Sequence, residues 1–189
     1  GVGGFLSIST RQREWAQVIT TAEREADVWA SVGIHPHEAD AHADMGEAAL
    51  LEAASHPRVI AIGETGLDYY YDHSDRQVQQ ALFRRHIAVS RATGLPIIIH
   101  TRDAEEDTAA ILRDEMEQGA FPALIHCFTA SAGFARIVLD LGLAISLSGI
   151  VTFKNAKDLQ EVAAEIPADR LLVETDAPFL APVPNRGKV

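Results

Sequence analysis

Five polar side chains that can bind a metal ion or move a proton each stand directly after a short apolar run of the chain. They are His35, Glu64, His100, His126 and Asp176. Histidine nitrogen and carboxylate oxygen together suit Zn²⁺, Mn²⁺ or Fe²⁺, and two such ions a few ångströms apart need a bridging carboxylate. Glu64 is the candidate bridge, whereas Asp176 can bind a metal ion and also orient or deprotonate a metal-activated water. The pattern predicts metal-dependent hydrolysis, with Glu64 and Asp176 as catalytic residues.

Each of these residues also has an ordinary structural explanation when it is taken alone. A single histidine at a strand end is more often solvated or hydrogen-bonded, Glu64 can cap the next element, and Asp176 can open a turn. Five metal-type residues behind five separate apolar runs are hard to explain by coincidence, which favours a metal site. The other histidines considered lie in predicted helices or loops and are interpreted as surface or structural residues: His42, His56, His73 and His86.

Two further features leave alternatives open. Cys127 follows His126, but adjacent residues of a strand point to opposite faces, which disfavours a Cys-His nucleophilic pair. The run Tyr69-Tyr70-Tyr71 follows the apolar stretch that leads to Glu64. Aromatic residues in a loop above a catalytic mouth can stack on a base or a sugar, and simple packing of the loop is an equal alternative.

Apolar runs of four to six residues bounded by glycine and polar residues are typical of strands buried on both faces, as in a parallel sheet covered by helices. The central run, Val59–Ile62, breaks at Gly63 just before Glu64. The expected strands lie at residues 5–8, 28–33, 59–62, 95–99, 123–125, 144–152 and 171–175. Helical periodicity predicts helices between them, one of which begins with a capping box at Ser74 and Gln77 and ends at Gly94.

This alternation predicts a parallel sheet, either doubly wound or closed into a barrel. A doubly wound sheet places its ligand mainly at one switch point, whereas a barrel gathers residues from the ends of many strands around one mouth. The separate strand ends favour the barrel. We therefore expect an α/β fold of the TIM type, a single incomplete domain over residues 1–189, with seven of eight strands present. The first strand is expected before Gly1, because such barrels usually have about 250 residues.

Composition limits the classes of function. The chain has 189 residues, 47% of them hydrophobic, and a net charge of −11, which argues against a broad basic surface for duplex nucleic acid. A metal pocket can still engage one or two phosphates locally. No apolar run reaches the roughly 18 residues of a membrane span, no signal peptide opens the chain, and a single cysteine fits a reducing compartment. We therefore expect a cytoplasmic protein without membrane contact.

Several stretches, in order, resemble the TatD-type metal-dependent hydrolases, a family that includes deoxyribonucleases. They are residues 33–37, 63–69, 96–102, 125–128, 148–150, 153–155, 174–178 and 184–188. The resemblance implies that the glutamate matching Glu64 bridges two divalent metal ions. It also implies that the site is completed by His100, His126 and Asp176.

The same resemblance implies two residues near the substrate phosphate, His35 and Arg102. The family opens with a His-x-His pair on its first strand and ends in a final helix, and neither has a counterpart here. We expect that both are missing from the ends of this sequence. The resemblance then implies that the chain alone binds metal poorly, especially at the ion that depends on the missing pair.

The leading hypothesis is hydrolysis of DNA phosphodiester bonds, from a single-stranded or frayed 3′ end, by a monomer that binds two divalent ions, Zn²⁺, Mg²⁺ or Mn²⁺. A rival is amidohydrolase-like hydrolysis of a small molecule. Many amidohydrolases bridge their metals with a lysine at a strand end, and the lysines here stand elsewhere: Lys154, Lys157 and Lys188. A third alternative is an inactive fragment that serves as a metal-free binding module.

Overall fold

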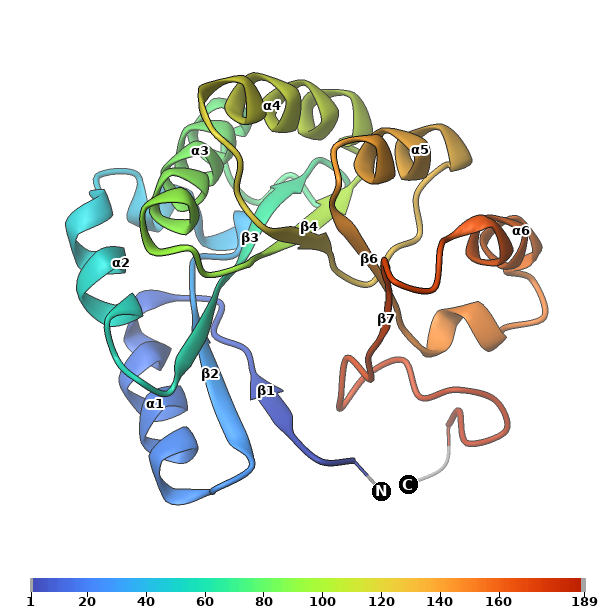
Figure 1. Cartoon of the computed structure of the whole chain (residues 1–189), viewed down its shortest axis with the longest axis horizontal. Coiled ribbons are helices and arrows are strands. Elements are labelled where there is room, and N and C mark those ends of the chain that lie inside the picture. The colour runs from blue at the N-terminus through green and yellow to red at the C-terminus, as the bar shows by residue number, and fades with distance from the viewer. Residues whose placement is uncertain (1, 188–189) are drawn as a thin grey trace. The chain divides into compact units, whose positions relative to one another are not determined.

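The computed structural model describes residues 2–187. The chain divides into two compact units, Gly1–Ala123 (unit 1) and Leu124–Val189 (unit 2). Figure 1 shows that strands and helices alternate along the chain in both units. This order of elements confirms the predicted α/β class.

Within residues 2–123, unit 1 contains four parallel strands that are neighbours in the order of the chain. They are β1 (Phe5–Ser7), β2 (Val28–Val32), β3 (Val59–Asp68) and β4 (Ile97–Arg102). The α-helices of the unit are α1 (Trp15–Arg24), α2 (Glu47–Ala54), α3 (Arg76–Thr93) and α4 (Glu105–Gln118). Short 3-10 helices are η1 (Gln12–Glu14), η2 (Pro36–Glu38) and η3 (Asp40–His42).

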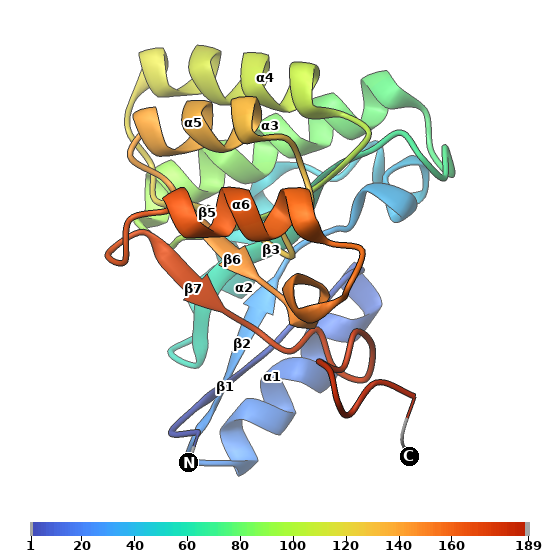
Figure 2. The same ribbon diagram turned by 90° about the vertical axis from the view of Figure 1, so that its right-hand side faces the viewer.

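Unit 2 continues the same pattern over its described residues, 124–187. Its strands are β5 (Ala123–Ile125), which begins at the boundary, β6 (Ala144–Leu147) and β7 (Leu171–Val173), again parallel and in chain order. Its helices are α5 (Ala132–Asp140), the 3-10 helix η4 (Gly149–Thr152) and α6 (Lys157–Glu165). Figure 2 shows α5 and α6 on the same side of β6 and β7.

The strand order decides between the two predicted kinds of sheet. In each unit every strand pairs in parallel with the next strand of the chain. The order does not reverse, as it would at the switch point of a doubly wound sheet. This succession is that of a TIM-type barrel, and seven of its strands lie within residues 2–187, as predicted.

The core of unit 1 explains why its strands are apolar on nearly every residue. β4 buries Ile97, Ile98 and Ile99 in succession, so both of its faces are covered. α3 buries Leu82 and Ile87 and packs against β3. Strands covered on both sides keep polar side chains only near their ends, where the candidate site residues stand.

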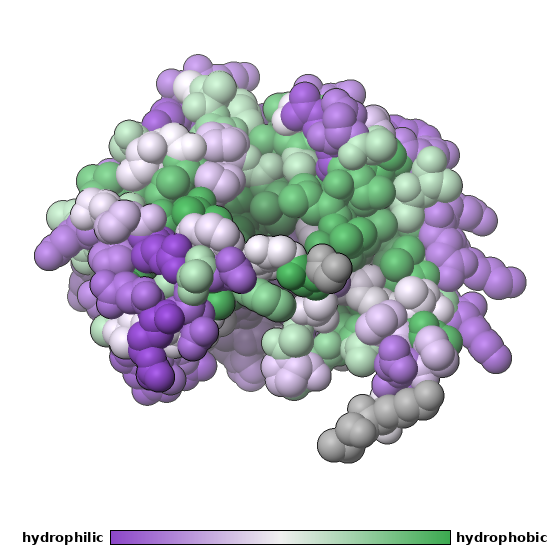
Figure 3. Space-filling view, turned by 60° about the horizontal axis from the view of Figure 1, so that its bottom comes forward, coloured by the Kyte–Doolittle hydropathy of each residue, from purple (hydrophilic) through white to green (hydrophobic). Residues whose placement is uncertain are grey.

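Some apolar side chains reach the surface. Figure 3 shows such hydrophobic residues, in green, among hydrophilic ones on one face of the molecule. In unit 1, β1 exposes Phe5 and Leu6, and in unit 2, β7 exposes Leu172 and Val173. Across the described part of the chain, none of the helices combines the length and the apolar composition that crossing a membrane requires.

β3 is longer than the sequence predicts. The strand that was expected to break at Gly63 continues to Asp68, so Glu64 lies within β3 and not behind its end. A Cβ atom at Gly66 would lie 2.0 Å from the backbone oxygen of His100, in the paired strand β4. Glycine is therefore present in β3 because neighbouring backbones approach closely, rather than because the strand ends.

Two other local predictions are wrong. The N-cap of α3 is Asp75, whose carboxylate accepts two backbone N–H groups, and not Ser74. The Ser74 hydroxyl instead accepts from the backbone N–H of Asp40 at 3.2 Å and donates to the backbone oxygen of His37 at 3.0 Å. The strand predicted at residues 144–152 ends at Leu147, because the chain then turns into η4.

Candidate metal centre

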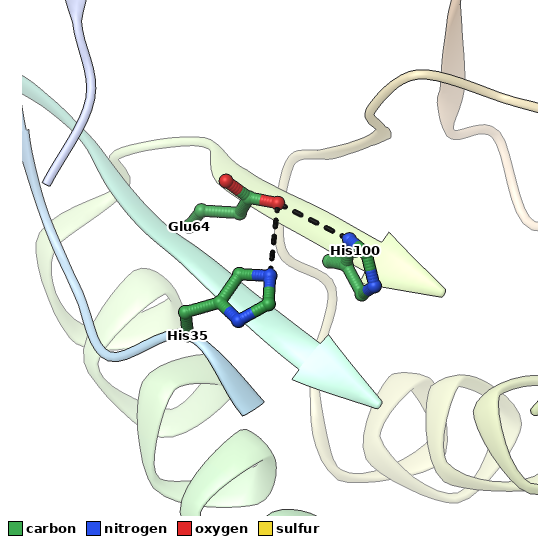
Figure 4. A group of neighbouring side chains, drawn as sticks. All are labelled: His35, Glu64 and His100. Carbon is green, nitrogen blue, oxygen red and sulfur yellow. Dashed lines mark ion pairs between the residues drawn. The ribbon is translucent and has the colours of Figure 1, made fainter. Parts of the chain in front are cut away.

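In unit 1, three of the predicted site residues come together: His35 follows β2, Glu64 lies in β3 and His100 lies in β4. Figure 4 shows one carboxylate oxygen of Glu64 facing both imidazoles. Glu64 Oε1 lies 3.6 Å from His35 Nε2 and 3.2 Å from His100 Nδ1. One potential ligand atom from each residue lies within 4.8 Å of the other two. The three side chains form one compact group, in which Glu64 and His100 are near enough to hold one ion.

The donor atoms of this group suit a divalent cation. Ligand atoms about 2.0–2.2 Å from a zinc-sized ion lie roughly 3–3.5 Å from one another, and the separation of 3.2 Å between Glu64 Oε1 and His100 Nδ1 lies in this range. Burial alone would lower the pKa of His100, but hydrogen bonds to Asp68 and Glu64 raise it to about 9. Surroundings that favour a positively charged imidazole also favour a bound cation.

Asp68 determines how His100 presents its ring. The Nε2–H group of His100 donates to Asp68 Oδ2 at 2.9 Å, so Nδ1 is the nitrogen that faces Glu64. Burial alone would raise the pKa of Asp68, but hydrogen bonds from His100, the backbone of Tyr71 and His37 hold it well below its usual range. A carboxylate behind a metal-binding histidine commonly orients the ring. Sequence patterns miss this role, because the partner of Asp68 depends on strand register.

The ring of His35 differs from that of His100, because its surroundings favour the neutral form. Its Nδ1 accepts a hydrogen bond from the backbone N–H group of His37 at 3.2 Å, and burial lowers its pKa to about 3. The ring is therefore neutral, and the tautomer with an accepting Nδ1 carries its proton on Nε2. Because Nε2 faces Glu64, His35 is arranged as a hydrogen-bond donor rather than as a metal ligand.

In unit 2, His126 and Asp176 come together with Glu174, a residue that sequence reasoning missed. The Nδ1–H group of His126 donates to the carboxylate of Glu174 at 2.9 Å, whereas Nε2 lies 3.6 Å from Asp176 Oδ1. Burial alone would raise the pKa of Glu174, but the hydrogen bond from His126 lowers it, so the carboxylate is ionised. Glu174 directly follows β7. A polar residue directly after an apolar strand is the signal by which the other site residues were predicted.

Arg102, predicted to lie near the substrate phosphate, is the last residue of β4 and is exposed. Its guanidinium carbon lies 4.0 Å from the ring centroid of Tyr70 and 4.8 Å from that of Tyr71. Arg102 is therefore outside the group of potential ligands but belongs to the same strand as His100. An accessible guanidinium at this position can bind an anion.

Comparisons with known proteins place the chain among metal-dependent hydrolases. The model of the family TatD related DNase matches residues 1–189. The chain is 47% identical over 161 residues to the metal-dependent hydrolase YabD of Bacillus subtilis, an alignment that covers 85% of the chain and 63% of YabD. The chain thus spans less than two thirds of the length of this relative.

Two further similarities concern a nuclease and a solved structure. The chain is 36% identical over 184 residues to the 3′-5′ ssDNA/RNA exonuclease TatD of Klebsiella pneumoniae, covering 96% of the chain and 69% of that protein. The crystal structure of YJJV, a TatD homologue from Escherichia coli, is similar with a TM-score of 0.89 and 29% identity, covering 99% of this chain and 72% of that chain.

Proposed function

Because the chain belongs to the family of TatD related DNases, we propose that it hydrolyses phosphodiester bonds of DNA in a reaction that depends on divalent metal ions. The relative named as a 3′-5′ ssDNA/RNA exonuclease supports a single-stranded or frayed 3′ end as the substrate. We propose that both units belong to one domain over residues 1–189, since the family model spans both. A monomer suffices, because each group of potential ligands forms within one chain.

The observation that carries this proposal is that each of two imidazoles lies between two carboxylates. His100 and His126 each donate one ring N–H to a carboxylate, and the other ring nitrogen faces a carboxylate of the same group. Glu64 and His100 would hold one cation, and His126 with Asp176 a second, Zn²⁺, Mg²⁺ or Mn²⁺. A bound divalent cation supplies Lewis-acid polarisation of the phosphate and lowers the pKa of water.

Side chains of the chain itself bind the phosphate and accept the proton. His35 donates its Nε2–H group to a phosphate oxygen, and Arg102 binds the phosphate through its planar guanidinium. Asp176 orients the attacking water and accepts its proton, since a carboxylate with 32% of its side chain exposed is accessible to water.

Small-molecule hydrolysis of the amidohydrolase kind has less support. Within residues 2–187, no lysine ends a strand in the way that a metal-bridging lysine would. Lys154 follows η4, and Lys157 begins α6. Lys188 lies outside the described residues. The histidine and carboxylate groups therefore favour the phosphodiesterase over this rival.

The test is release of nucleotides from 3′-labelled single-stranded DNA by metal-free protein to which Mg²⁺, Mn²⁺ or Zn²⁺ is added back. Glu64→Gln and Asp176→Asn should each lower the rate by about 100-fold or more, because each removes a charged oxygen ligand and preserves the side-chain shape. Glu23→Gln is the matched control, since Glu23 is exposed and pairs with His56 outside both groups.

Two results would contradict the proposal in different ways. Wild-type rates in both site variants would remove Glu64 and Asp176 from the chemistry. Bound metal without any cleavage of DNA would instead favour hydrolysis of a small molecule at the same site. Metal content is therefore measured on every sample beside the rate.

A further inference from the structure

The tyrosine run that follows the strand residue Asp68 contains one anchored ring and two exposed rings. The hydroxyl of Tyr69 donates to Asp107 Oδ2 at 2.7 Å and accepts from the Gln80 amide at 2.8 Å. Burial, together with the hydrogen bond to Asp107, raises the pKa of Tyr69 to about 12. By contrast, Tyr70 and Tyr71 are 56% and 49% exposed. Tyr69 is therefore structural, whereas the next two rings face solvent.

Two more side chains extend the exposed rings into an aromatic platform, which consists of Tyr70, Tyr71, His73 and Arg102. The rings of Tyr70 and Tyr71 meet edge to face, with centroids 4.9 Å apart and planes at 89°. His73 is stacked with Tyr71 at 5.5 Å and 5°. The Arg102 guanidinium lies over both tyrosines in a cation–π arrangement. Aromatic faces and a planar cation are thus held together at the surface.

The platform is continuous with the candidate metal group of unit 1. The backbone N–H groups of Tyr70 and Tyr71 both donate to Asp68 Oδ1, so the carboxylate behind the metal group also holds the base of the platform. The ring of Tyr71 meets the ring of His37 at 5.3 Å, and His37 meets His35 at 4.4 Å. A row of rings therefore leads from the hydrogen-bond donor of the site to the exposed tyrosines.

We infer that this platform is a nucleotide-binding subsite, in which Tyr70 and Tyr71 stack on the bases of a single-stranded nucleic acid while Arg102 binds a neighbouring phosphate. The inference rests on the proposed phosphodiesterase function and specifies how that site recognises its substrate. Stacking tolerates every sequence because each base has a π-face. A planar guanidinium can bind phosphate through two parallel N–H groups.

The charge of the chain makes such a local subsite necessary for tight binding. With a net charge of −11, these 189 residues on average repel the phosphate backbone. Stacking does not depend on net charge, and one positioned guanidinium acts at short range. The combination supplies affinity for single strands, whose bases are free to stack, and little affinity for a closed duplex.

A purely structural platform would behave differently. If the rings only hold Arg102 in place, removing them weakens the binding of phosphate equally with and without bases. Because both rings are exposed, their truncation should leave the fold intact, and thermal unfolding checks this. The two interpretations are separated by comparing a single strand that has bases with one that has none.

The test uses fluorescence anisotropy of the full chain, loaded with Mn²⁺, and two labelled oligonucleotides with hydrolysis-resistant phosphorothioate linkages. One is hexathymidylate, and the other is its abasic counterpart with the same number of phosphates. Replacing both exposed tyrosines, Tyr70→Ala with Tyr71→Ala, should weaken the binding of hexathymidylate by about 5- to 150-fold. The binding of the abasic strand should stay within about twofold of wild type.

Two control variants make the result specific to the rings. Tyr70→Phe with Tyr71→Phe keeps both rings without their hydroxyl groups and should restore the affinity for hexathymidylate. Phe5→Ala removes an equally exposed ring, 58% exposed, from β1 and should change neither affinity. Photocrosslinking to a strand that carries 5-iodouracil adds a direct readout, and mass spectrometry should find the crosslink on Tyr70 or Tyr71.

Three outcomes would overturn the subsite: no preference of the wild type for bases, equal weakening for both strands in the alanine variant, or crosslinks on neither tyrosine. Failure of the proposed phosphodiesterase function is recognised separately. It would appear as absent metal-dependent cleavage of unmodified DNA while the preference for hexathymidylate persists.

Discussion

His100 and His126 each donate one ring N–H to a carboxylate, but from opposite nitrogens, Nε2 in His100 and Nδ1 in His126. The carboxylate behind His100 belongs to Asp68, which is fully buried in β3 and also accepts two backbone N–H groups of the following loop. The carboxylate behind His126 belongs to Glu174, which follows β7 on a loop shared with the more exposed Asp176. Glu174 also has hydrogen bonds with Ser146 and with the backbone of Cys127, so the two carboxylates differ mainly in burial, with 1% of the Asp68 side chain and 18% of the Glu174 side chain exposed.

The largest effect on metal binding is expected from Asp68→Asn. The amide keeps the shape of the carboxylate but not its charge. With its oxygen held by the two backbone N–H groups of the loop, its NH₂ group faces His100 and His37, which both lose their acceptor. We expect metal affinity to fall by about 10- to 100-fold, measured by titration calorimetry. Asp114→Asn is the control, since it removes an exposed carboxylate paired with Arg84. An unchanged affinity would mean that no carboxylate is needed behind His100.

A smaller effect is expected from Glu174→Gln in unit 2. The Glu174 side chain is 18% exposed, against 1% for Asp68, so a water molecule can replace part of the lost hydrogen bond more easily than in unit 1. The same titration should show a loss of affinity within about tenfold. Glu165→Gln, which changes an exposed carboxylate near Arg136 in α6, is the matched control. A loss larger than that of Asp68→Asn would reverse the comparison between the two units.

Sequence patterns predict where the potential ligands lie better than how their rings are oriented. The strands before His100 and His126 are apolar on successive residues, and neighbouring parallel strands end at one edge, so their polar ends can be found by spacing. Ring orientation depends on which carboxylate lies behind each histidine. Strand register and loop path decide that, and for this reason Asp68 and Glu174 receive no role from the sequence.

The local errors have a common physical cause. Gly63 and Ser74 carry strong local signals, for a strand end and for a helix cap, and tertiary contacts override both. A Cβ atom at Gly33 would lie 2.4 Å from Gly63 Cα, so glycine serves the close approach of β2 and β3. The Ser74 oxygen accepts the backbone N–H of Asp40 from another segment, and Asp75 caps the start of α3. Neither contact can be read from neighbouring residues.

The two units also differ in the histidines that they bury. In unit 1, His86 of α3 is fully buried, accepts the backbone N–H of Ile34 at Nε2, and donates from Nδ1 to the backbone oxygen of Leu82. Burial lowers the pKa of His86 to about 4, against the opposing effect of the Leu82 hydrogen bond and with smaller contributions from Arg85 and His42. His86 thus has the structural role that its position in a helix predicts.

Buried, neutral His86 predicts that acid lowers the local stability of unit 1 more than that of unit 2. This is the smallest effect of the series. Because the folded pKa of His86 lies below its usual value of 6.5, the unfolded chain takes up the proton first. The stability due to neutral His86 is complete above pH 6.5 and declines as the pH falls toward 4, by about 1 kcal/mol at pH 5.5. Hydrogen exchange, corrected for intrinsic rates, should therefore accelerate at Ile34 between pH 7 and 5.5 more than at Ile145 in β6. His86→Gln should reduce the difference, and the remainder is due to His35, whose pKa burial also lowers. An equal response of both amides in the wild type would contradict the prediction.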